Sequence, residues 1–181
     1  MSYYERTDLK AYSLWLVPSD PAIAARLGSI IGHYSRELDT PLWSPHITLL
    51  GGIASKPERV RDLTAQVAKA VPPFRVKLEA IAIKDMFFQC VMAVPGPSDA
   101  LVRLNEAARE GFGQIGAPEY WPHLSLVYGD LEHSVKQRVA DEIKRQSTVV
   151  GIEFEISSVQ IWSMEGEIKD WALVAEFPLG S

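Results

Sequence analysis

Two histidines of this chain lie in nearly identical short stretches. One stretch reads PHITLL from Pro45 and the other reads PHLSLV from Pro122, so that His123 follows His46 by 77 residues. Successive side chains of a strand point to opposite faces, so each histidine shares a face with the hydroxyl residue two positions later. Each stretch therefore predicts a strand with one aliphatic face for the core and one face that carries an imidazole and a hydroxyl.

Four side chains, those of His46, Thr48, His123 and Ser125, would surround one small site if the two polar faces met. Hydrolysis of a cyclic phosphodiester needs a base that activates water and an acid that protonates the departing oxygen, and histidine suits both roles near neutral pH. A positioned acid or base typically contributes about 10²–10⁴ in rate. The hydroxyls can donate hydrogen bonds to the phosphate oxygens as charge develops there. The pattern therefore predicts a phosphate site with its own acid and base.

A packing role is the simpler interpretation of one histidine in a single Pro-His-x-Thr stretch. Two copies at equivalent points of the chain favour the catalytic interpretation instead. A zinc site is a weaker alternative, because two histidines leave zinc short of its usual three or four protein ligands and no third ligand repeats at matching positions. We therefore expect no metal and no cofactor. The other histidines, His33 and His133, are predicted to lie on the surface.

The elements around the two stretches repeat as well. Residues 12–17 form a predicted strand that ends at Pro18, and residues 91–94 end at Pro95, again 77 residues later. Each of these strands is followed by a helix, a histidine strand, a second helix and a hairpin. The matched prolines and the matched order of elements indicate an internal duplication.

The predicted fold class is α+β. The repeats run roughly over residues 12–94 and 88–177, within one bilobal domain over residues 1–181. We expect pseudo-twofold symmetry, two mainly antiparallel sheets flanked by helices, and a central cleft where the two histidine strands face each other.

Local signals set the expected ends of several elements. Gly51 and Gly52 are expected to stop the first histidine strand. Ser55 is expected to cap the next helix as part of a capping box, with proline in the first turn. Residues 87–94 are expected to form a strand that returns as the hairpin partner of residues 74–83.

Composition limits the function classes. The net charge of −5 counts against a broad basic surface for long nucleic acid. The single cysteine, Cys90, permits no intramolecular disulfide, and its apolar neighbours indicate a buried structural thiol. Residues 1–10 lack the apolar run of a signal peptide, and no apolar stretch approaches the ~20 residues of a membrane span. We expect a cytoplasmic protein (a nuclear location is the alternative) that acts as a monomer on a small-molecule substrate, without a membrane partner.

The two Pro-His-aliphatic-Thr/Ser-aliphatic stretches resemble the paired motifs of the 2H phosphoesterase superfamily. Three blocks are similar to the plant and fungal cyclic phosphodiesterases within it: YSLWLVP from Tyr12, FFQCV from Phe87 and YWPHLSLVY from Tyr120. The resemblance implies hydrolysis of ADP-ribose 1″,2″-cyclic phosphate to ADP-ribose 1″-phosphate. It also implies opening of nucleoside 2′,3′-cyclic phosphates to 2′-phosphates, with no metal required.

The resemblance also implies roles for individual residues. The two histidines and the two hydroxyl residues would be the catalytic tetrad. Tyr128 matches a family tyrosine near the attacking water, and Trp15 and Phe88 match aromatic residues that line the cleft. On the 77-residue offset Trp15 corresponds to Met92, and Phe88 is expected to share a strand face with Met92. Both aromatic rings are therefore expected to reach the cleft, where they could stack on a base or ribose.

Tyr128 breaks the repeat, because its equivalent in the first copy is Gly51. A hydroxyl on the second side alone suits a role in holding the attacking water there. This asymmetry favours His123 as the base and His46 as the acid.

Two alternatives stay open. One is a 2′-5′ RNA ligase-like or RNA-end phosphodiesterase of the same superfamily, which would want a basic groove that leads to the site. The other is a module that binds cyclic phosphates without turnover. Such a module would not need a paired acid and base.

Overall fold

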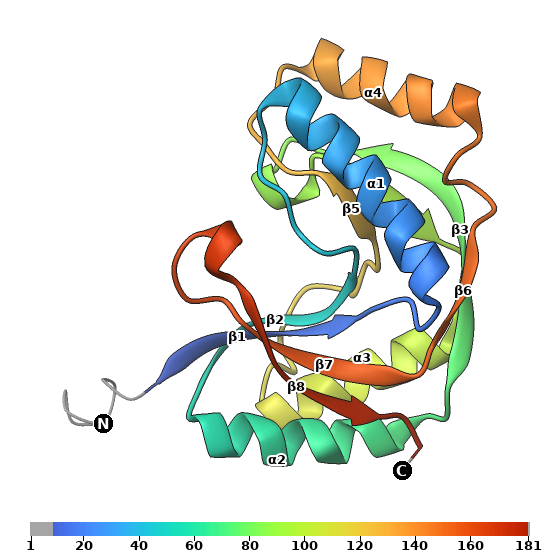
Figure 1. Cartoon of the computed structure of the whole chain (residues 1–181). Helices are drawn as coiled ribbons and strands as arrows, with labels where there is room; N and C mark the ends of the chain where they lie inside the picture. Colours follow the sequence, from blue (N-terminus) through green and yellow to red (C-terminus); the bar gives the residue numbers. More distant parts are fainter. Residues whose placement is uncertain (1–8, 181) are drawn as a thin grey trace.

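The computed structural model describes residues 9–180 as one antiparallel sheet with helices packed against it (Figure 1). The strands follow the order β6-β3-β4-β5-β2-β1-β7-β8. The two strands at the centre, β5 and β2, are those that follow the two histidines. The expectation that the chain begins without a signal peptide rests mainly on residues 1–8, which lie outside the described residues.

The strands are short, and each of the two central ones begins one residue after its histidine. Their bounds are β1 Lys10–Leu16, β2 Ile47–Ser55, β3 Phe74–Ile83, β4 Val91–Pro95, β5 Leu124–Val127, β6 Glu153–Ile156, β7 Ser158–Ser163 and β8 Ala172–Pro178. Short 3₁₀ turns lie at η2 Ala68–Ala70, η3 Phe87–Gln89 and η4 Ile168–Asp170.

The α+β class with antiparallel pairing is confirmed. The strands form one continuous sheet, whereas the sequence predicts two sheets. The join is narrow, because β2 and β5 share a single residue pair, Ile47 with Leu124. One half of the sheet contains β6, β3, β4 and β5, and the other contains β2, β1, β7 and β8. Since β3 pairs with β4 and β7 pairs with β1, each half contains strands from both sequence repeats.

The register of the central strands follows the 77-residue offset. Trp15 pairs with Thr48 between β1 and β2, and Met92 pairs with Ser125 between β4 and β5. The single pair between β2 and β5 joins a residue to its own equivalent in the other repeat. This is the register that a local twofold axis through that pair requires. Equivalent elements of the two repeats therefore meet at the centre of the molecule, next to the histidines.

Over residues 9–180, four α-helices cover the sheet in two pairs. Their bounds are α1 Pro21–Leu38, α2 Pro57–Val67, α3 Asp99–Phe112 and α4 His133–Gln146. Helix α1 packs on β5 and α4 packs on β3 and β4, while α3 packs on β2 and α2 packs on β7 and β8 (Figure 1). Each half of the sheet is thus covered by one helix from each repeat.

Polar side chains cap the first turns of two helices. Asp20 caps α1, where its Oδ1 accepts a hydrogen bond from the Ala22 amide at 2.8 Å. Ser98 caps α3, where its Oγ accepts from the Leu101 amide at 3.3 Å. Within residues 9–180, no helix combines the length and the apolar character that crossing a membrane requires.

Strand β2 continues through the two glycines that are expected to stop it. Its register with β1 shifts between Tyr12 and Leu14, and Gly52 lies opposite this shift with a φ of 65°. Glycine adopts positive φ without a steric penalty from Cβ, so the glycines form a bulge within the strand. Ser55 is therefore the last residue of β2, and α2 begins after Lys56 without a side-chain capping bond. The capping-box prediction is wrong.

Residues 87–94 divide into the turn η3 and the strand β4. The buried Lys136 of α4 holds the chain before η3, because its Nζ donates to the Asp85 carboxylate and to the Lys84 carbonyl oxygen at 3.3 Å. This anchor lies outside the sheet. The sequence predicts that Phe88 shares a strand face with Met92. Phe88 lies in η3 instead, so this prediction is wrong.

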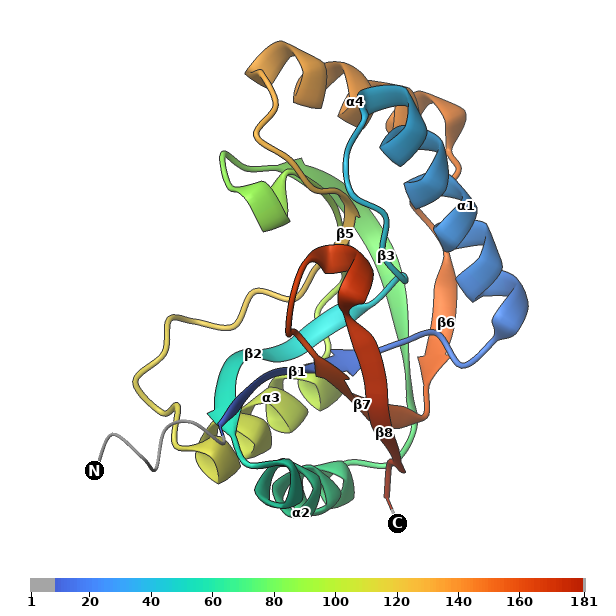
Figure 2. The same ribbon diagram turned by 60° about the vertical axis from the view of Figure 1, so that its left-hand side comes forward.

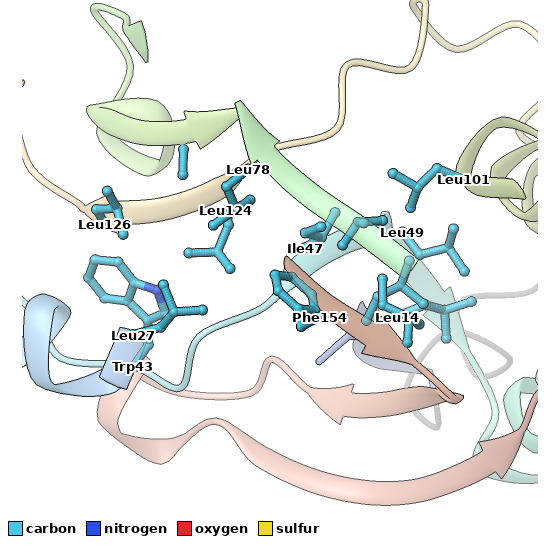
Figure 3. Packing of buried hydrophobic residues seen from close by; sticks show 14 of the residues in the cluster. Leu14, Leu27, Trp43, Ile47, Leu49, Leu78, Leu101, Leu124, Leu126 and Phe154 are labelled. Carbon is cyan, nitrogen blue, oxygen red and sulfur yellow. The ribbon is translucent and has the colours of Figure 1, made fainter. Parts of the chain in front are cut away.

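The aliphatic faces of the two histidine strands form the centre of the core. Ile47, Leu49, Leu124 and Leu126 are all buried, and Figure 3 shows them among the packed side chains of the cluster. Burial of one such side chain contributes about 1.5–3 kcal/mol. Because side chains alternate along a strand, this burial leaves the histidine and hydroxyl faces on the other side.

Candidate active site

The two polar faces line one cavity of about 570 Å³, which we call the histidine cavity. His46 and Thr48 reach it from the start of β2, and His123 and Ser125 reach it from the start of β5. The structure thus brings together the four side chains whose spacing points to one site. Their catalytic roles stay predictions.

Each imidazole is held by a backbone carbonyl two residues earlier. His46 Nδ1 lies 2.8 Å from the Ser44 carbonyl oxygen, and His123 Nδ1 lies 3.0 Å from the Trp121 carbonyl oxygen. A carbonyl oxygen only accepts hydrogen bonds, so we infer that Nδ1 carries the proton in each neutral ring. Nε2 is then the nitrogen that can accept or deliver a proton.

Burial shifts both histidines towards the neutral form, because loss of solvent disfavours the charged ring. It lowers the pKa of His46 to about 3, against the opposing effect of the hydrogen bond to Ser44. Burial also lowers the pKa of His123, and the nearby Lys84 ammonium adds to that shift. Both rings are therefore neutral at neutral pH, and an anion in the cavity would favour their charged forms.

The hydroxyl side is organised by backbone carbonyls. Ser125 Oγ donates to the Phe88 carbonyl oxygen at 2.9 Å, which ties β5 to η3. The Tyr120 hydroxyl donates to the Thr48 carbonyl oxygen at 3.0 Å, and burial raises the pKa of Tyr120. Tyr120 was not predicted as a site residue. It fastens the long segment between α3 and β5, which loops out beside β2, to that strand (Figure 2).

Tyr128 lies in the wall of the histidine cavity at the end of β5. Its ring stacks on Trp43, with centroids 3.4 Å apart and planes 12° apart. Burial raises the pKa of Tyr128, against a smaller opposing effect of the Ser125 hydroxyl. The phenol therefore stays protonated and can donate a hydrogen bond, which suits the holding of a water molecule.

Trp15 lines the cavity, but both faces of its indole are covered. His46 lies against one face, with centroids 3.4 Å apart and planes 1° apart. Trp162 stacks at 4.1 Å and 19°, necessarily on the other face, because two rings cannot occupy the same space. Trp15 Nε1 also donates to Ser13 Oγ at 3.1 Å. These contacts leave no face of the indole for a base or ribose, which counts against the stacking role expected for Trp15.

Phe88 lies at the mouth of the histidine cavity and is 51% exposed. Its ring meets that of Tyr128 at 5.2 Å in an edge-to-face arrangement. Trp171, which was not predicted as a site residue, faces Phe88 at 6.0 Å from the other half of the sheet. Phe88 thus keeps a reachable ring at the cavity, where Trp15 does not.

The tryptophans of the chain gather around this cavity. The sequence shows how many there are but does not show that they meet at one place. Trp15 and Trp171 line it, and each of the other three, Trp43, Trp121 and Trp162, stacks on or tilts against a ring of the site. They arrive there from strands and loops far apart in the sequence.

Lys84 brings a cation close to the His123 side of the site. Its Nζ lies 3.6 Å from the centroid of the Trp121 ring and donates to Gln89 Oε1 at 3.1 Å. Gln89 lines the histidine cavity, and because its oxygen is engaged, its amide nitrogen is the group free to face a ligand. Neither residue was predicted from the sequence, although Gln89 lies inside the block beginning at Phe87.

The remaining candidate groups lie outside the cavity. The side chain of His33 is 57% exposed and pairs with Glu37 at 3.4 Å, and His133 is exposed at the start of α4. Cys90 is fully buried, and burial raises the pKa of its thiol. Residues 9–180 contain no group of three or more His, Cys, Asp or Glu side chains that could hold a metal ion.

Three comparisons place the chain among known proteins. The family profile described as "2'-5' RNA ligase superfamily" matches residues 19–167. The cyclic phosphodiesterase of Arabidopsis thaliana is 19% identical over 175 residues, which cover 94% of this chain and 96% of that protein. The 2',3'-cyclic-nucleotide 3'-phosphodiesterase of Yarrowia lipolytica is 24% identical over 208 residues, which cover 90% and 96% respectively.

Among solved structures, the LigT protein of E. coli complexed with 3'-AMP aligns with a TM-score of 0.64 at 13% identity. The alignment covers 96% of this chain and 99% of that one. At this identity the likeness shows a shared fold.

Proposed function

The chain belongs to the 2′-5′ RNA ligase superfamily, the 2H phosphoesterases, and from that premise we propose that it opens small cyclic phosphodiesters with two histidines and no metal. The two relatives from Arabidopsis thaliana and Yarrowia lipolytica are both named for the hydrolysis of cyclic phosphodiesters, which supports this proposal. The proposed substrates are nucleoside 2′,3′-cyclic phosphates, opened to 2′-phosphates, and ADP-ribose 1″,2″-cyclic phosphate, opened to ADP-ribose 1″-phosphate.

One observation carries the proposal. Two imidazoles at equivalent positions of adjacent strands share one cavity, and each is fixed through Nδ1 by its own carbonyl. A binding module would gain nothing from two rings that are each oriented to exchange a proton at Nε2. General acid–base catalysis needs this arrangement.

The reaction needs one proton removed and one delivered. A neutral imidazole takes a proton from water as the water oxygen attacks phosphorus. The bond from phosphorus to the 3′ oxygen breaks on the opposite side, and the protonated imidazole gives its proton to that oxygen. The products are the 3′ hydroxyl and the 2′-phosphate, and the two histidines end in exchanged protonation states.

The surroundings of the two rings support His123 as the base and His46 as the acid. Lys84 disfavours the charged form of His123, so this ring is suited to start neutral. The indole face of Trp15 lies directly on His46, and an aromatic face attracts a cation. Burial opposes protonation of His46 in the empty cavity, and the negative charge of the cyclic phosphate supplies the compensation.

The hydroxyls supply hydrogen bonds to the phosphate. In the proposed complex Thr48 and Ser125 donate to the two non-bridging oxygens, for which Ser125 must leave the Phe88 carbonyl. Such bonds strengthen as charge builds on these oxygens in the transition state. The protonated Tyr128 phenol holds the attacking water beside His123.

We propose that the protein acts as a monomer in the cytoplasm and binds neither a membrane nor long nucleic acid. The net charge of −5 supports the last point, and the single buried cysteine supports a reducing compartment.

The test is turnover of adenosine 2′,3′-cyclic phosphate and of ADP-ribose 1″,2″-cyclic phosphate, with products identified by phosphorus NMR in the presence and absence of EDTA. We expect a 2′-phosphate from the nucleotide and full activity with EDTA. His46→Ala and His123→Ala should each lower kcat by about 10²–10⁴, the usual contribution of a positioned acid or base.

His33→Ala is the matched control, because it removes an exposed histidine from α1, and it should leave kcat unchanged. Binding without turnover by the intact protein would overturn the proposal that it is an enzyme. Loss of activity with EDTA would overturn the metal-free mechanism. Faster turnover of RNA ends that carry the same cyclic phosphate would favour the RNA-end activity over small substrates.

A further inference from the structure

The loop that joins β3 to β4, green in Figure 1, carries two polar residues beside the histidine cavity: Lys84 before η3 and Gln89 at its end. Lys84 Nζ donates to Gln89 Oε1 at 3.1 Å. A lysine ammonium has donors only, so the amide oxygen of Gln89 must be the atom that faces it. The Gln89 side chain lines the cavity, and within residues 9–180 its Nε2 has no hydrogen-bond acceptor. The amide therefore keeps two N–H donors for a ligand in the cavity.

The position of the Lys84 side chain is itself fixed. The backbone amide of Lys84 donates to the Cys90 carbonyl oxygen at 3.2 Å, and the buried Lys136 donates to the Lys84 carbonyl oxygen at 3.3 Å. The ammonium lies 3.6 Å from the centroid of the Trp121 ring, whose face attracts a cation. The Gln89 amide is thus oriented by a cation that the surrounding structure holds in place.

Lys84 brings positive charge that no carboxylate offsets. Asp85, the neighbouring acid, pairs with Lys136 instead, and no carboxylate within residues 9–180 forms an ion pair with Lys84. Among the described residues, no lysine or arginine lines the histidine cavity itself. Because opposite charges attract more strongly where water is excluded, the charge of Lys84 favours an anionic group as the acceptor for Gln89.

Gln89 lies beside one of the hydroxyls that are proposed to bind the phosphate. Ser125 Oγ donates at 2.9 Å to the carbonyl oxygen of Phe88, in the peptide group that joins Phe88 to Gln89. On the same side of the site, the Trp121 ring is inclined to the His123 ring, with centroids 5.0 Å apart. A phosphate that contacts Ser125 and His123 would therefore lie next to the Gln89 amide.

We propose that Gln89 Nε2 donates a hydrogen bond to the non-bridging phosphate oxygen that Ser125 binds, and that Lys84 strengthens this bond through the Gln89 oxygen. The inference rests on the proposed function and adds a phosphate contact to it. An ammonium that is bound to the amide oxygen polarises the amide, so the N–H groups become better donors. The bond strengthens further as charge builds on the phosphate oxygen in the transition state. Gln89 is then a catalytic residue, and Lys84 is a positioning residue that acts through it.

The experiment compares kcat/KM on adenosine 2′,3′-cyclic phosphate and on methyl riboside 2,3-cyclic phosphate, which has no base. Gln89→Leu removes the amide and should lower kcat/KM by about 10- to 100-fold on both substrates, as expected for loss of a hydrogen bond to a charged group. A loss on the adenosine substrate alone would mean that Gln89 contacts the base, and it would overturn the proposal. Unchanged kcat/KM on both substrates would overturn it as well.

Gln89→Glu separates a phosphate contact from a structural role. Glutamate has nearly the same shape and pairs more strongly with Lys84, so thermal unfolding should show no loss of stability. It offers no donor and its charge repels the phosphate, so kcat/KM should fall further than in Gln89→Leu. A smaller fall than in Gln89→Leu would mean that the residue only supports the loop. Gln137→Leu, which removes an exposed glutamine from α4, is the matched control and should leave kcat/KM unchanged.

The role of Lys84 is tested by combining variants. Lys84→Met alone should lower kcat/KM by about threefold to tenfold, and Lys84→Arg, which keeps the charge and the donor, should restore most of this loss. In the Gln89→Leu background Lys84→Met should cause a smaller loss, because the amide through which it acts is absent. Equal losses in the two backgrounds would overturn the action of Lys84 through Gln89. Lys77→Met, which removes an exposed lysine from β3, controls for the loss of one positive charge and should leave kcat/KM unchanged.

A binding measurement separates this inference from the proposed function. Calorimetric affinities of adenosine 2′-phosphate and of adenosine do not depend on turnover. Gln89→Leu should weaken the binding of adenosine 2′-phosphate about tenfold and leave the binding of adenosine unchanged. Equal weakening of both compounds, or of neither, would overturn the phosphate contact even if the enzyme is active. The expected difference in a protein without turnover would support the contact while the proposed function fails.

Discussion

The two histidines share one kind of backbone bond but differ in what surrounds their rings. His46 is covered by the indole of Trp15, which Trp162 supports from behind. His123 has the Lys84 ammonium as an electrostatic neighbour and Trp121 inclined at 5.0 Å. An aromatic face stabilises the protonated form of His46, and the Lys84 ammonium destabilises the protonated form of His123. The repeat makes the two rings equivalent, and these neighbours favour His46 as the acid and His123 as the base.

Replacing the indole under His46 should therefore change the pH dependence of kcat. With Trp15→Leu, the protonated form of His46 loses its aromatic face, which contributes up to about 2 kcal/mol when desolvated. The pKa of the acid in the enzyme–substrate complex falls by about one unit, so the alkaline limb of the kcat profile moves to lower pH by that amount. KM should change little, because the indole offers no face to the substrate.

Trp162→Phe is the control for this shift, because Trp162 contacts Trp15 on the face away from His46. The alkaline limb of Trp162→Phe should stay at the wild-type pH. The alkaline limb of Trp15→Phe, which keeps an aromatic ring, should lie at a pH between those of wild type and Trp15→Leu. An alkaline limb that does not move in Trp15→Leu would contradict the role of the indole.

At the scale of elements, the bulge in β2 lets the first histidine strand run nine residues where its equivalent in the second repeat runs four. The bulge depends on Gly52, whose φ of 65° lies in the left-handed region. A Cβ at this position would meet no atom within 4 Å, so the backbone conformation alone makes the position require glycine. Gly51 and Gly52 both line the histidine cavity just beyond Thr48.

Gly52→Ala should therefore lower the free energy of unfolding by about 1–2 kcal/mol, the cost of a Cβ in the left-handed region. Urea unfolding measures this change. Gly116→Ala is the matched control, because a Cβ at Gly116 also meets no atom within 4 Å and its φ lies outside the positive range. Gly116→Ala should cost clearly less, and equal costs for the two variants would contradict the account of the bulge.

The elements that could be predicted are those whose signals are local. Prolines mark the ends of β1 and β4, and the Pro-His stretches give the two central strands. The sequence does not reveal that residues 87–89 leave the sheet, because the cause is Lys136, a residue of α4 far along the chain. Nor does it reveal the single sheet, because the join of β2 and β5 is one residue pair whose pairing is a matter of tertiary packing.

At the scale of the whole molecule, part of the site could be predicted from the sequence and part depends on tertiary packing. The duplication predicts the four residues that strands bring to the centre, since a twofold axis places equivalent strands together. It says nothing of Gln89 and Trp171, which reach the cavity from the two hairpin loops, or of Tyr120, whose hydroxyl donates to the Thr48 carbonyl oxygen. For Trp15 the strand face was predicted correctly, but the rings that cover it come from His46 and from β7.

The buried pair of histidines also makes the stability of the whole fold depend on pH. The pKa of His46 falls from 6.5 to about 3 on folding, chiefly through burial, and that of His123 moves in the same direction. Below pH 6.5 the unfolded chain binds a proton that the folded chain does not, so stability is lost as pH falls from about 6.5 towards 3. At pH 4.5 the loss of unfolding free energy that is due to His46 is about 2–3 kcal/mol, since each pH unit below 6.5 costs about 1.4 kcal/mol.

Urea unfolding of wild type and His46→Asn at pH 7.5 and pH 4.5 tests this dependence. Asparagine does not titrate, and its amide nitrogen can still donate to the Ser44 carbonyl, so His46→Asn should lose about 2–3 kcal/mol less than wild type between the two values. His33→Asn, which replaces an exposed histidine of α1, should show the wild-type loss. The same loss in wild type and His46→Asn would mean that His46 is protonated in the folded protein at pH 4.5, and that its burial does not hold it neutral.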